Sequence, residues 1–152
     1  MSKDATTKKP TGLALYTAAA EKASAVVIDQ YSTSFGWATK LLAPYERQHV
    51  RNIYAMVRVA DEIVDGSAAD AALNAPEINP ELELNAFEQE TYRAMQLGFS
   101  TNLIIHAFAV TAREVGISKD IVEPFFYSMR QDLTETEHTQ ETFDTYVYGS
   151  AE

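Results

Sequence analysis

Helical periodicity is the feature that most limits the fold of this chain, and it runs from Leu13 almost to Glu152. Apolar residues recur at spacings of three and four, and prolines and glycines divide this pattern into segments. We predict helices over 13–30, 44–65, 80–97, 102–115 and 118–133, a short helix after "YSTSF" and a last helix after Thr139. The sequence therefore predicts an all-α fold.

Several residues predict where these helices begin. Ser32 or Ser34 is the expected N-cap of the short helix, and Ser100 or Thr101 that of the helix over 102–115. Pro44 suits the first turn of the helix that follows it.

Other residues predict helix ends and breaks. Gly66 is expected as the C′ residue of the helix that starts at Pro44, and Pro124 as a kink or a second start. Residues 67–81 contain two prolines and are expected to form a loop. "TETEHT" at 134–139 is expected to be a polar connection.

Composition narrows the classes of function. The 152 residues suffice for one domain, and the absence of cysteine excludes disulfides and thiolate chemistry. A net charge of −10 argues against nucleic acid as a partner, because phosphate binding needs a basic surface. Residues 1–12 are polar and are expected to be a disordered leader before a single domain over 13–152. No apolar run is long enough to cross a membrane, and we expect a cytoplasmic protein.

The end of the helix over 44–65 carries unfavourable charge. Its last residues, "DEIVD", bring Asp61, Glu62 and Asp65 to the negative end of the helix dipole, and two of them form a like-charge pair four residues apart. On a helical wheel, Asp61 falls inside the apolar stripe of Val50, Ile53, Val57, Ala60 and Val64. Asp65 falls on its border, and Glu62 points further out. The first two carboxylates are therefore expected to face inward or to lie at the edge of the core.

Two interpretations of these acids remain open from the residues alone. In one, they form salt bridges with Arg58 and its neighbours, or the helix end is exposed. In the other, two carboxylates one turn apart hold Mg²⁺, which prefers oxygen ligands and often shares them with substrate phosphates. Arg58, one turn earlier, could then contact a phosphate.

The flanking sequence resembles the squalene/phytoene synthase family. The resemblance rests on "YSTSFGWATKLLAPYERQHVRNIYAMVRVADEIVDG" and on a second patch, "FFYSMRQDL" followed by "TFDTYVYGSAE". It covers roughly residues 31–152 and implies a class I isoprenoid-synthase fold, an all-α helical bundle around a central cavity. It also implies Mg²⁺, or Mn²⁺ in its place, as cofactor and isoprenyl diphosphates as substrates.

The resemblance implies roles for individual residues. Asp61 and Asp65 match the first metal-binding aspartate pair, and Glu62 stands where many members also have an acid, so all three are expected metal ligands. The matching diphosphate contacts are Arg58 and Ser32, and the matching cavity residues are Phe35 and Tyr54, for which plain core packing is the alternative. Asp132 matches an acid near the cavity, with a capping or salt-bridge role equally open.

The implied reaction joins two allylic diphosphates head to head through a cyclopropyl intermediate. The "YVYGSAE" segment is more similar to phytoene synthases, which use geranylgeranyl diphosphate, and the alternative is a squalene- or dehydrosqualene-type enzyme using farnesyl diphosphate. The apolar product suggests peripheral contact with membranes.

The sequence also departs from the family pattern. Ser128 stands where glycine is usual and His138 where tyrosine is common. The family's second aspartate-rich motif would lie beyond Glu152, so we expect a truncated N-terminal portion that makes no product alone and that pairs with a missing C-terminal half.

Two alternatives come from other classes. Glu46 with His49, and Glu135 with His138, have the E-x-x-H spacing of di-iron bundles, but the further inward glutamates are not evident. His106 in "LIIHAF" is expected to be a core histidine with its hydrogen bonds satisfied. A non-catalytic all-α assembly subunit related to the synthases is the second alternative.

Overall fold

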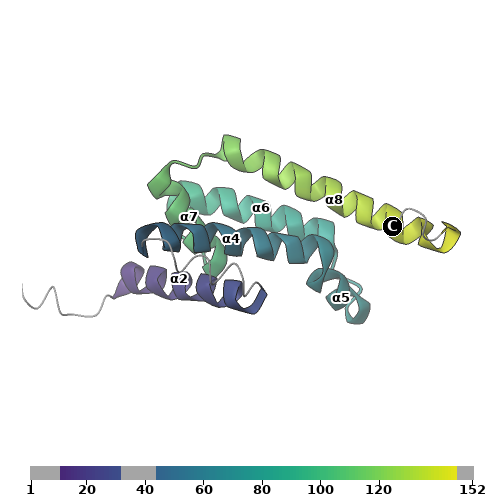
Figure 1. The fold of residues 1–152 in the computed structure, drawn as a ribbon, viewed down its shortest axis with the longest axis horizontal. Coiled ribbons are helices and arrows are strands. Elements are labelled where there is room, and N and C mark those ends of the chain that lie inside the picture. Colours follow the sequence, from purple (N-terminus) through teal and green to yellow (C-terminus); the bar gives the residue numbers. More distant parts are fainter. Residues whose placement is uncertain (1–10, 32–43, 147–152) are drawn as a thin grey trace, which may run out of the picture.

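The computed structural model describes residues 11–31 and 44–146, and of residues 135–146 the backbone alone. All regular structure in these ranges is helical (Figure 1). The helices are α2 (Gly12–Tyr31), α4 (Pro44–Asp65), α5 (Ser67–Asn74), α6 (Pro80–Leu97), α7 (Leu103–Val115) and α8 (Lys119–Tyr146). The all-α prediction is confirmed, whereas the short helix expected after "YSTSF" and residues 1–10 lie outside the described residues.

Some helix boundaries follow the expected chemistry. Asn79 caps α6 by accepting hydrogen bonds from the backbone N–H groups of Glu81 and Leu82, at 2.9 and 3.1 Å. Gly98 and Gly116 end α6 and α7 with φ of 85° and 87°, the left-handed conformation that glycine adopts without steric cost. The predicted last residues of these two helices, 97 and 115, are confirmed.

Two expected connections are helical instead. Residues 67–74, predicted as part of a loop, form α5, because four alanines in this stretch favour helix and the prolines come only after it. The "TETEHT" stretch and Thr139 lie inside α8, which is continuous from Lys119 to Tyr146. No proline or glycine interrupts that stretch, so its polarity alone does not end the helix. Pro124 lies near the start of this same helix and does not begin a second one.

Two predicted helix-end roles are also corrected. Asn102, not Ser100 or Thr101, is the N-cap of α7. Gly66 follows the last residue of α4 as expected, but its φ is −151°, so it does not adopt the left-handed C′ conformation.

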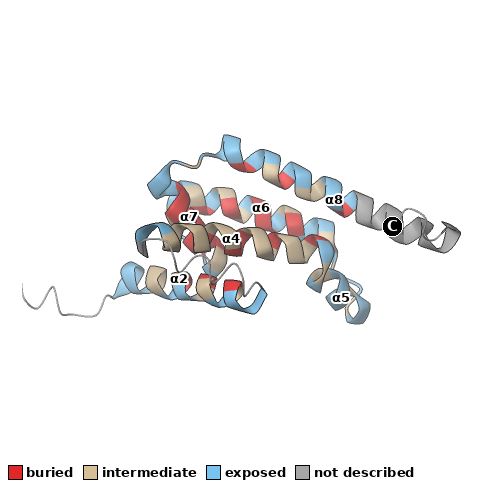
Figure 2. Ribbon diagram, viewed as in Figure 1, coloured by how far each residue is buried: buried red, intermediate tan, exposed pale blue. Residues whose placement is uncertain are grey.

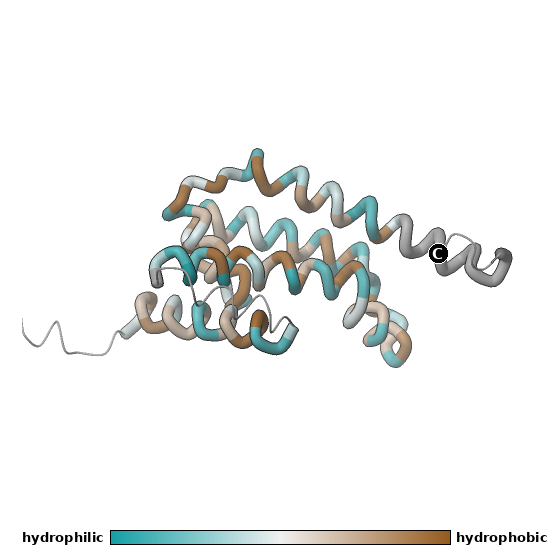
Figure 3. The backbone as a smooth tube through the Cα atoms, viewed as in Figure 1, coloured by the Kyte–Doolittle hydropathy of each residue, from teal (hydrophilic) through white to brown (hydrophobic). Residues whose placement is uncertain are grey.

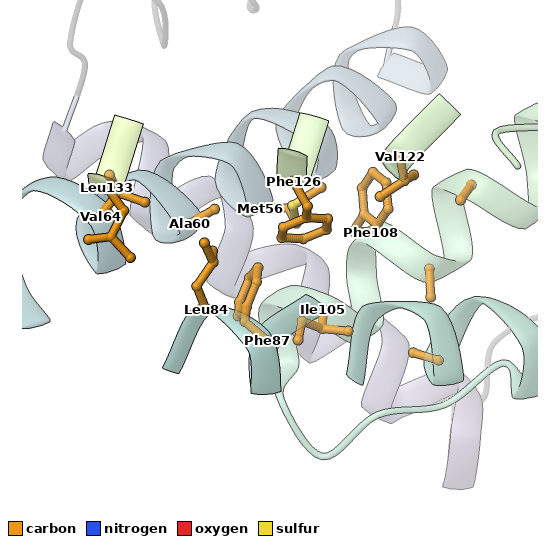
Figure 4. Packing of buried hydrophobic residues seen from close by; sticks show 13 residues of the cluster. Met56, Ala60, Val64, Leu84, Phe87, Ile105, Phe108, Val122, Phe126 and Leu133 are labelled. Carbon is orange, nitrogen blue, oxygen red and sulfur yellow. The ribbon is translucent and has the colours of Figure 1, made fainter. Parts of the chain in front are cut away.

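Helix α4 is the centre of the bundle, since it contacts α2, α5, α6, α7 and α8. The core is built by one face each of α4, α6, α7 and α8, and its larger members are Met56, Val64, Leu84, Phe87, Ile105, Phe108, Val122, Phe126 and Leu133. In Figure 4, Leu133 lies beside Val64 and Phe126 beside Met56, so α8 rests directly on α4. Figure 2 shows the buried positions gathered where α4, α6 and α7 meet.

Helix α2 packs on α4 and α7 along one side of the bundle. Its buried positions are the small residues Ala20 and Ser24, together with Ile28. Within the described part of the chain, no helix combines the length and the apolar character needed to cross a membrane.

Candidate functional site

Helix α4 carries two sets of apolar residues, of which one is buried in the core and the other is half-buried. Its buried residues are Asn52, Ala55, Met56, Ala60 and Val64. A second set, Val50, Ile53, Tyr54 and Val57, is half-buried and lines an open groove of about 300 Å³. Figure 3 shows hydrophobic positions recurring along α4 between hydrophilic ones. Wheel angles do not separate the two sets, because Val64 falls between Ile53 and Val57 on the wheel, and spacing alone does not show where neighbouring helices cover α4.

The two aspartates continue the groove face. At 100° per residue, Asp61 falls about 40° from Val57 and Asp65 about 40° further round, both towards the C-terminal end of α4. The Asp61 side chain is 36 % exposed, and Asp65 is exposed. Of the two positions expected, the interior is therefore wrong, and the half-buried Asp61 lies at the edge of the core. A partly exposed carboxylate one turn beyond the groove residue Val57 stays hydrated and can meet a ligand.

Arg58 is held by several groups one turn before Asp61. Its Nη1 lies 3.2 Å from Asp61 Oδ2, and its Nη2 donates to Glu62 Oε2. The guanidinium carbon lies 5.0 Å from the centre of the Tyr31 ring, within the range of a cation–π contact. Arg58 Nε is buried and has no hydrogen-bond partner among the described residues. A buried N–H donor without a partner costs about 1–3 kcal/mol.

Glu62 links the end of α4 to the start of α5. Its Oε1 accepts hydrogen bonds from the Ser67 hydroxyl at 2.6 Å and from the Ser67 backbone N–H at 3.2 Å. The hydrogen bond from the Ser67 hydroxyl lowers the pKa of the Glu62 carboxyl from its ordinary value, and the bond from Arg58 is the next largest cause. Glu62 is therefore ionised at neutral pH, and both of its oxygens are engaged.

The metal-binding prediction meets a site with few protein ligands. Among the described residues, no three His, Asp or Glu side chains converge on a point that could hold a metal ion. Asp61 and Asp65 lie one turn apart, and no described residue hydrogen-bonds or ion-pairs with the Asp65 carboxylate. Mg²⁺ commonly takes one or two carboxylates and completes its shell with water and substrate phosphates, so this donor set fits that ion.

The other predicted site residues fall in different places. Tyr54 lines the groove, and its role as a cavity residue stays a prediction. Asp132 is exposed on α8, and Ser32 and Phe35 lie outside the described residues. The contact of Tyr31 with Arg58 and the hydrogen bonds of Ser67 to Glu62 were not predicted. The signal for Ser67 was present, because a serine two residues after a helix end can hydrogen-bond a side chain of the last turn.

The E-x-x-H residues do not form an iron site in the described part of the chain. His49 Nδ1 is 2.8 Å from Thr111 Oγ1, its Nε2 lies 3.4 Å from Glu114, and Glu46 is exposed. The side chains of Glu135 and His138 are outside the described residues. His106 is fully buried and hydrogen-bonded, so the prediction of a satisfied core histidine is confirmed.

Comparison with known proteins adds evidence independent of this geometry. The family model for squalene/phytoene synthases matches residues 28–152, which include the whole of α4, α5, α6, α7 and α8. No curated protein and no solved structure matches the chain at the significance required.

Proposed function

The chain belongs to the squalene/phytoene synthase family, whose members are prenyltransferases that join isoprenyl diphosphates head to head, and we propose that it forms one wall of such an active site. The proposed substrate is geranylgeranyl diphosphate, and the proposed product is phytoene. The resemblance of "YVYGSAE" to the phytoene branch supports this choice of substrate.

The observation that carries the proposal is the arrangement on one face of α4. The apolar groove of Val50, Ile53, Tyr54 and Val57 is followed along the helix by Arg58, Asp61 and Asp65. An isoprenyl diphosphate has the same polarity, with a long hydrocarbon chain and a compact anion at one end. One face can therefore bind both parts of the substrate at once.

Asp61 and Asp65 are the proposed metal ligands. When bound, Mg²⁺ neutralises the diphosphate and makes it a better leaving group. The two carboxylates hold the cation on the groove side of α4, at the end where the diphosphate is expected. This arrangement also removes the electrostatic penalty of two acids at a helix C-terminus.

The remaining residues act on the substrate directly. Arg58, whose side chain is 26 % exposed, donates hydrogen bonds to diphosphate oxygens through its Nη atoms. The groove residues exclude water from the allylic cation that forms when the carbon–oxygen bond breaks, which prevents its hydrolysis. The aromatic face of Tyr54 can stabilise that cation, because the faces of aromatic rings attract positive charge.

Calorimetric binding of a non-hydrolysable analogue, geranylgeranyl thiodiphosphate, tests this function on the 152-residue chain. We expect binding that requires Mg²⁺ and that weakens by about 10- to 100-fold in Asp61→Asn and in Asp65→Asn, the loss typical of changes at a metal site. Asp120→Asn is the matched control, since Asp120 is an exposed aspartate in the first turn of α8.

Two results would contradict the proposal. Equal affinity for the analogue with and without Mg²⁺ would contradict the proposed metal site. A loss of affinity in Asp120→Asn equal to that in the Asp61 and Asp65 variants would show a general effect of charge. Tighter binding of the farnesyl analogue than of the geranylgeranyl analogue would assign the chain to the squalene type instead.

A further inference from the structure

Glu62 lies between the proposed metal ligands but is bonded away from them. One of its oxygens accepts from Arg58 Nη2, and the other accepts from both the hydroxyl and the backbone N–H of Ser67. Its side chain is 21 % exposed, less than that of Asp61. A carboxylate with both oxygens committed to neighbouring donors is poorly placed to bind a cation as well.

We propose that Glu62 is a positioning residue, which fixes the Arg58 guanidinium for a diphosphate and is not itself a metal ligand. The inference rests on the proposed function, because that function makes Arg58 the diphosphate contact. The guanidinium is forked between two acids, with Nη1 on Asp61 and Nη2 on Glu62. Ser67 in turn holds Glu62 at the first residue of α5, so the orientation of Arg58 depends on the junction of two helices.

Gly66 lies close to the Glu62 carboxylate. A Cβ atom built on Gly66 would lie 2.7 Å from Glu62 Oε1, so a side chain at this position would require the end of the Glu62 side chain to shift. Such a shift would disturb the bonds that Glu62 Oε1 accepts from Ser67. The glycine therefore leaves the carboxylate in place over the turn.

Without Glu62, Asp61 would be the one acidic side chain among the described residues that pairs with the Arg58 guanidinium. Two consequences follow for binding. The guanidinium would lose its fixed orientation toward a diphosphate, and its full charge would compete with a metal for Asp61. Glu62 therefore keeps Arg58 oriented and keeps it shared between two acids.

The sign of the effect on anion binding separates positioning from simple charge. Glu62→Gln removes a negative charge beside an anion site, so Coulomb attraction alone predicts tighter binding of pyrophosphate. Positioning predicts weaker binding, by about tenfold, because a charge-assisted hydrogen bond that orients the guanidinium is lost. The two explanations thus predict opposite changes.

The experiment uses the 152-residue chain with Mn²⁺ and inorganic pyrophosphate as probes. We expect Glu62→Gln to weaken pyrophosphate binding about tenfold and Mn²⁺ binding far less than Asp61→Asn does. Ser67→Ala, which removes one of the two Ser67 donors, is expected to act in the same direction with a smaller effect. In an Arg58→Gln background, Glu62→Gln is expected to have no further effect on pyrophosphate binding.

Nitrogen NMR of the Arg58 guanidinium gives a readout that needs no ligand. Rotation about its Cζ–Nε bond is expected to be slow in the wild type and about tenfold faster in Glu62→Gln, because the bond to Nη2 is lost. The matched control is Glu90→Gln, since Glu90 likewise accepts from an arginine, Arg93, and from a serine hydroxyl, that of Ser100. This control is expected to leave the Arg58 signals unchanged.

Unchanged Arg58 rotation in Glu62→Gln, tighter pyrophosphate binding, or a loss of Mn²⁺ affinity equal to that of Asp61→Asn would each overturn the inference. Failure of the proposed function gives a different pattern. In that case Asp61→Asn and Asp65→Asn change neither Mn²⁺ nor pyrophosphate binding, while the Arg58 rotation still reports whether Glu62 holds the guanidinium.

Discussion

His106 shows how a single buried residue joins three parts of the bundle. Its Nδ1 accepts a hydrogen bond from the Ser100 backbone N–H at 3.2 Å, so Nε2 carries the proton of the neutral ring and lies 2.9 Å from Thr17 Oγ1. The rings of Tyr16 and Phe99 pack against the imidazole ring in T-shaped arrangements, with interplanar angles of 85° and 74°. Burial lowers the pKa of His106, so the folded protein favours the neutral form.

This lowered pKa predicts a pH-dependent stability. Below about pH 6.5 the unfolded chain binds a proton at His106 that the folded chain does not, so the free energy of unfolding should fall as the pH is lowered. The contribution is complete above pH 6.5, and its slope cannot exceed about 1.4 kcal/mol per pH unit. Urea unfolding between pH 7.5 and 5 should show a steeper dependence in the wild type than in His106→Gln. Equal slopes in both proteins would contradict the assignment.

Residue-level predictions succeeded where the sequence neighbours determine the environment. His106 sits in "LIIHAF", and apolar neighbours on every side already indicate burial. The partners of Arg58 could not be predicted as fully. Its contact with Tyr31 joins α2 to α4, and Ser67 reaches Glu62 only because α5 starts directly after Gly66. Such contacts depend on how helices meet, which residue spacing does not specify.

At the scale of elements, the strong helices were predicted and the weak boundaries were not. The segments that became α2, α4, α6 and α7 have clear periodicity, and the last three are each followed directly by glycine. The sequence predicts a loop that includes residues 67–74, because serine, aspartate, asparagine and nearby prolines usually mark turns. The alanines of this stretch outweighed those signals, and Ala75 N–H closes the helix by donating to Ala71.

The N-cap of α7 gives an element-scale prediction. The Asn102 side chain accepts from the backbone N–H groups of Ile104 and Ile105, both at 3.0 Å, whereas Thr101 is exposed. Asn102→Ala should lower the free energy of unfolding by about 1 kcal/mol, because two helix N–H groups lose their acceptor. Thr101→Ala is the matched control and should change it by less than about 0.5 kcal/mol. Urea unfolding of both variants measures the difference, and a larger loss in Thr101→Ala would restore the cap predicted from sequence.

At the scale of the molecule, the position of α4 decides what the site can be. Neighbouring helices bury Met56 and Val64 of α4 and leave the groove of Val50, Ile53, Tyr54 and Val57 open among the described residues. The sequence shows the apolar residues of α4 and places Asp61 and Asp65 at wheel angles close to those of Val57 and Tyr54. It did not contain the packing that turned one face into core and the other into groove, since that depends on helices distant in sequence.

The groove gives the prediction that belongs to this scale. Val57→Gln places a polar amide in an apolar groove without touching Arg58 or the aspartates, and burying an unpaired polar group against a ligand costs about 1–3 kcal/mol. Affinity for geranylgeranyl thiodiphosphate should therefore fall about tenfold or more, while affinity for inorganic pyrophosphate in the presence of Mg²⁺ should stay the same. Val26→Gln is the matched control, because Val26 is an exposed valine on α2. Calorimetry with both ligands separates the two parts of the site. An equal fall for both ligands in Val57→Gln would mean that the substitution disturbs the end of α4 and that the groove does not bind the hydrocarbon chain.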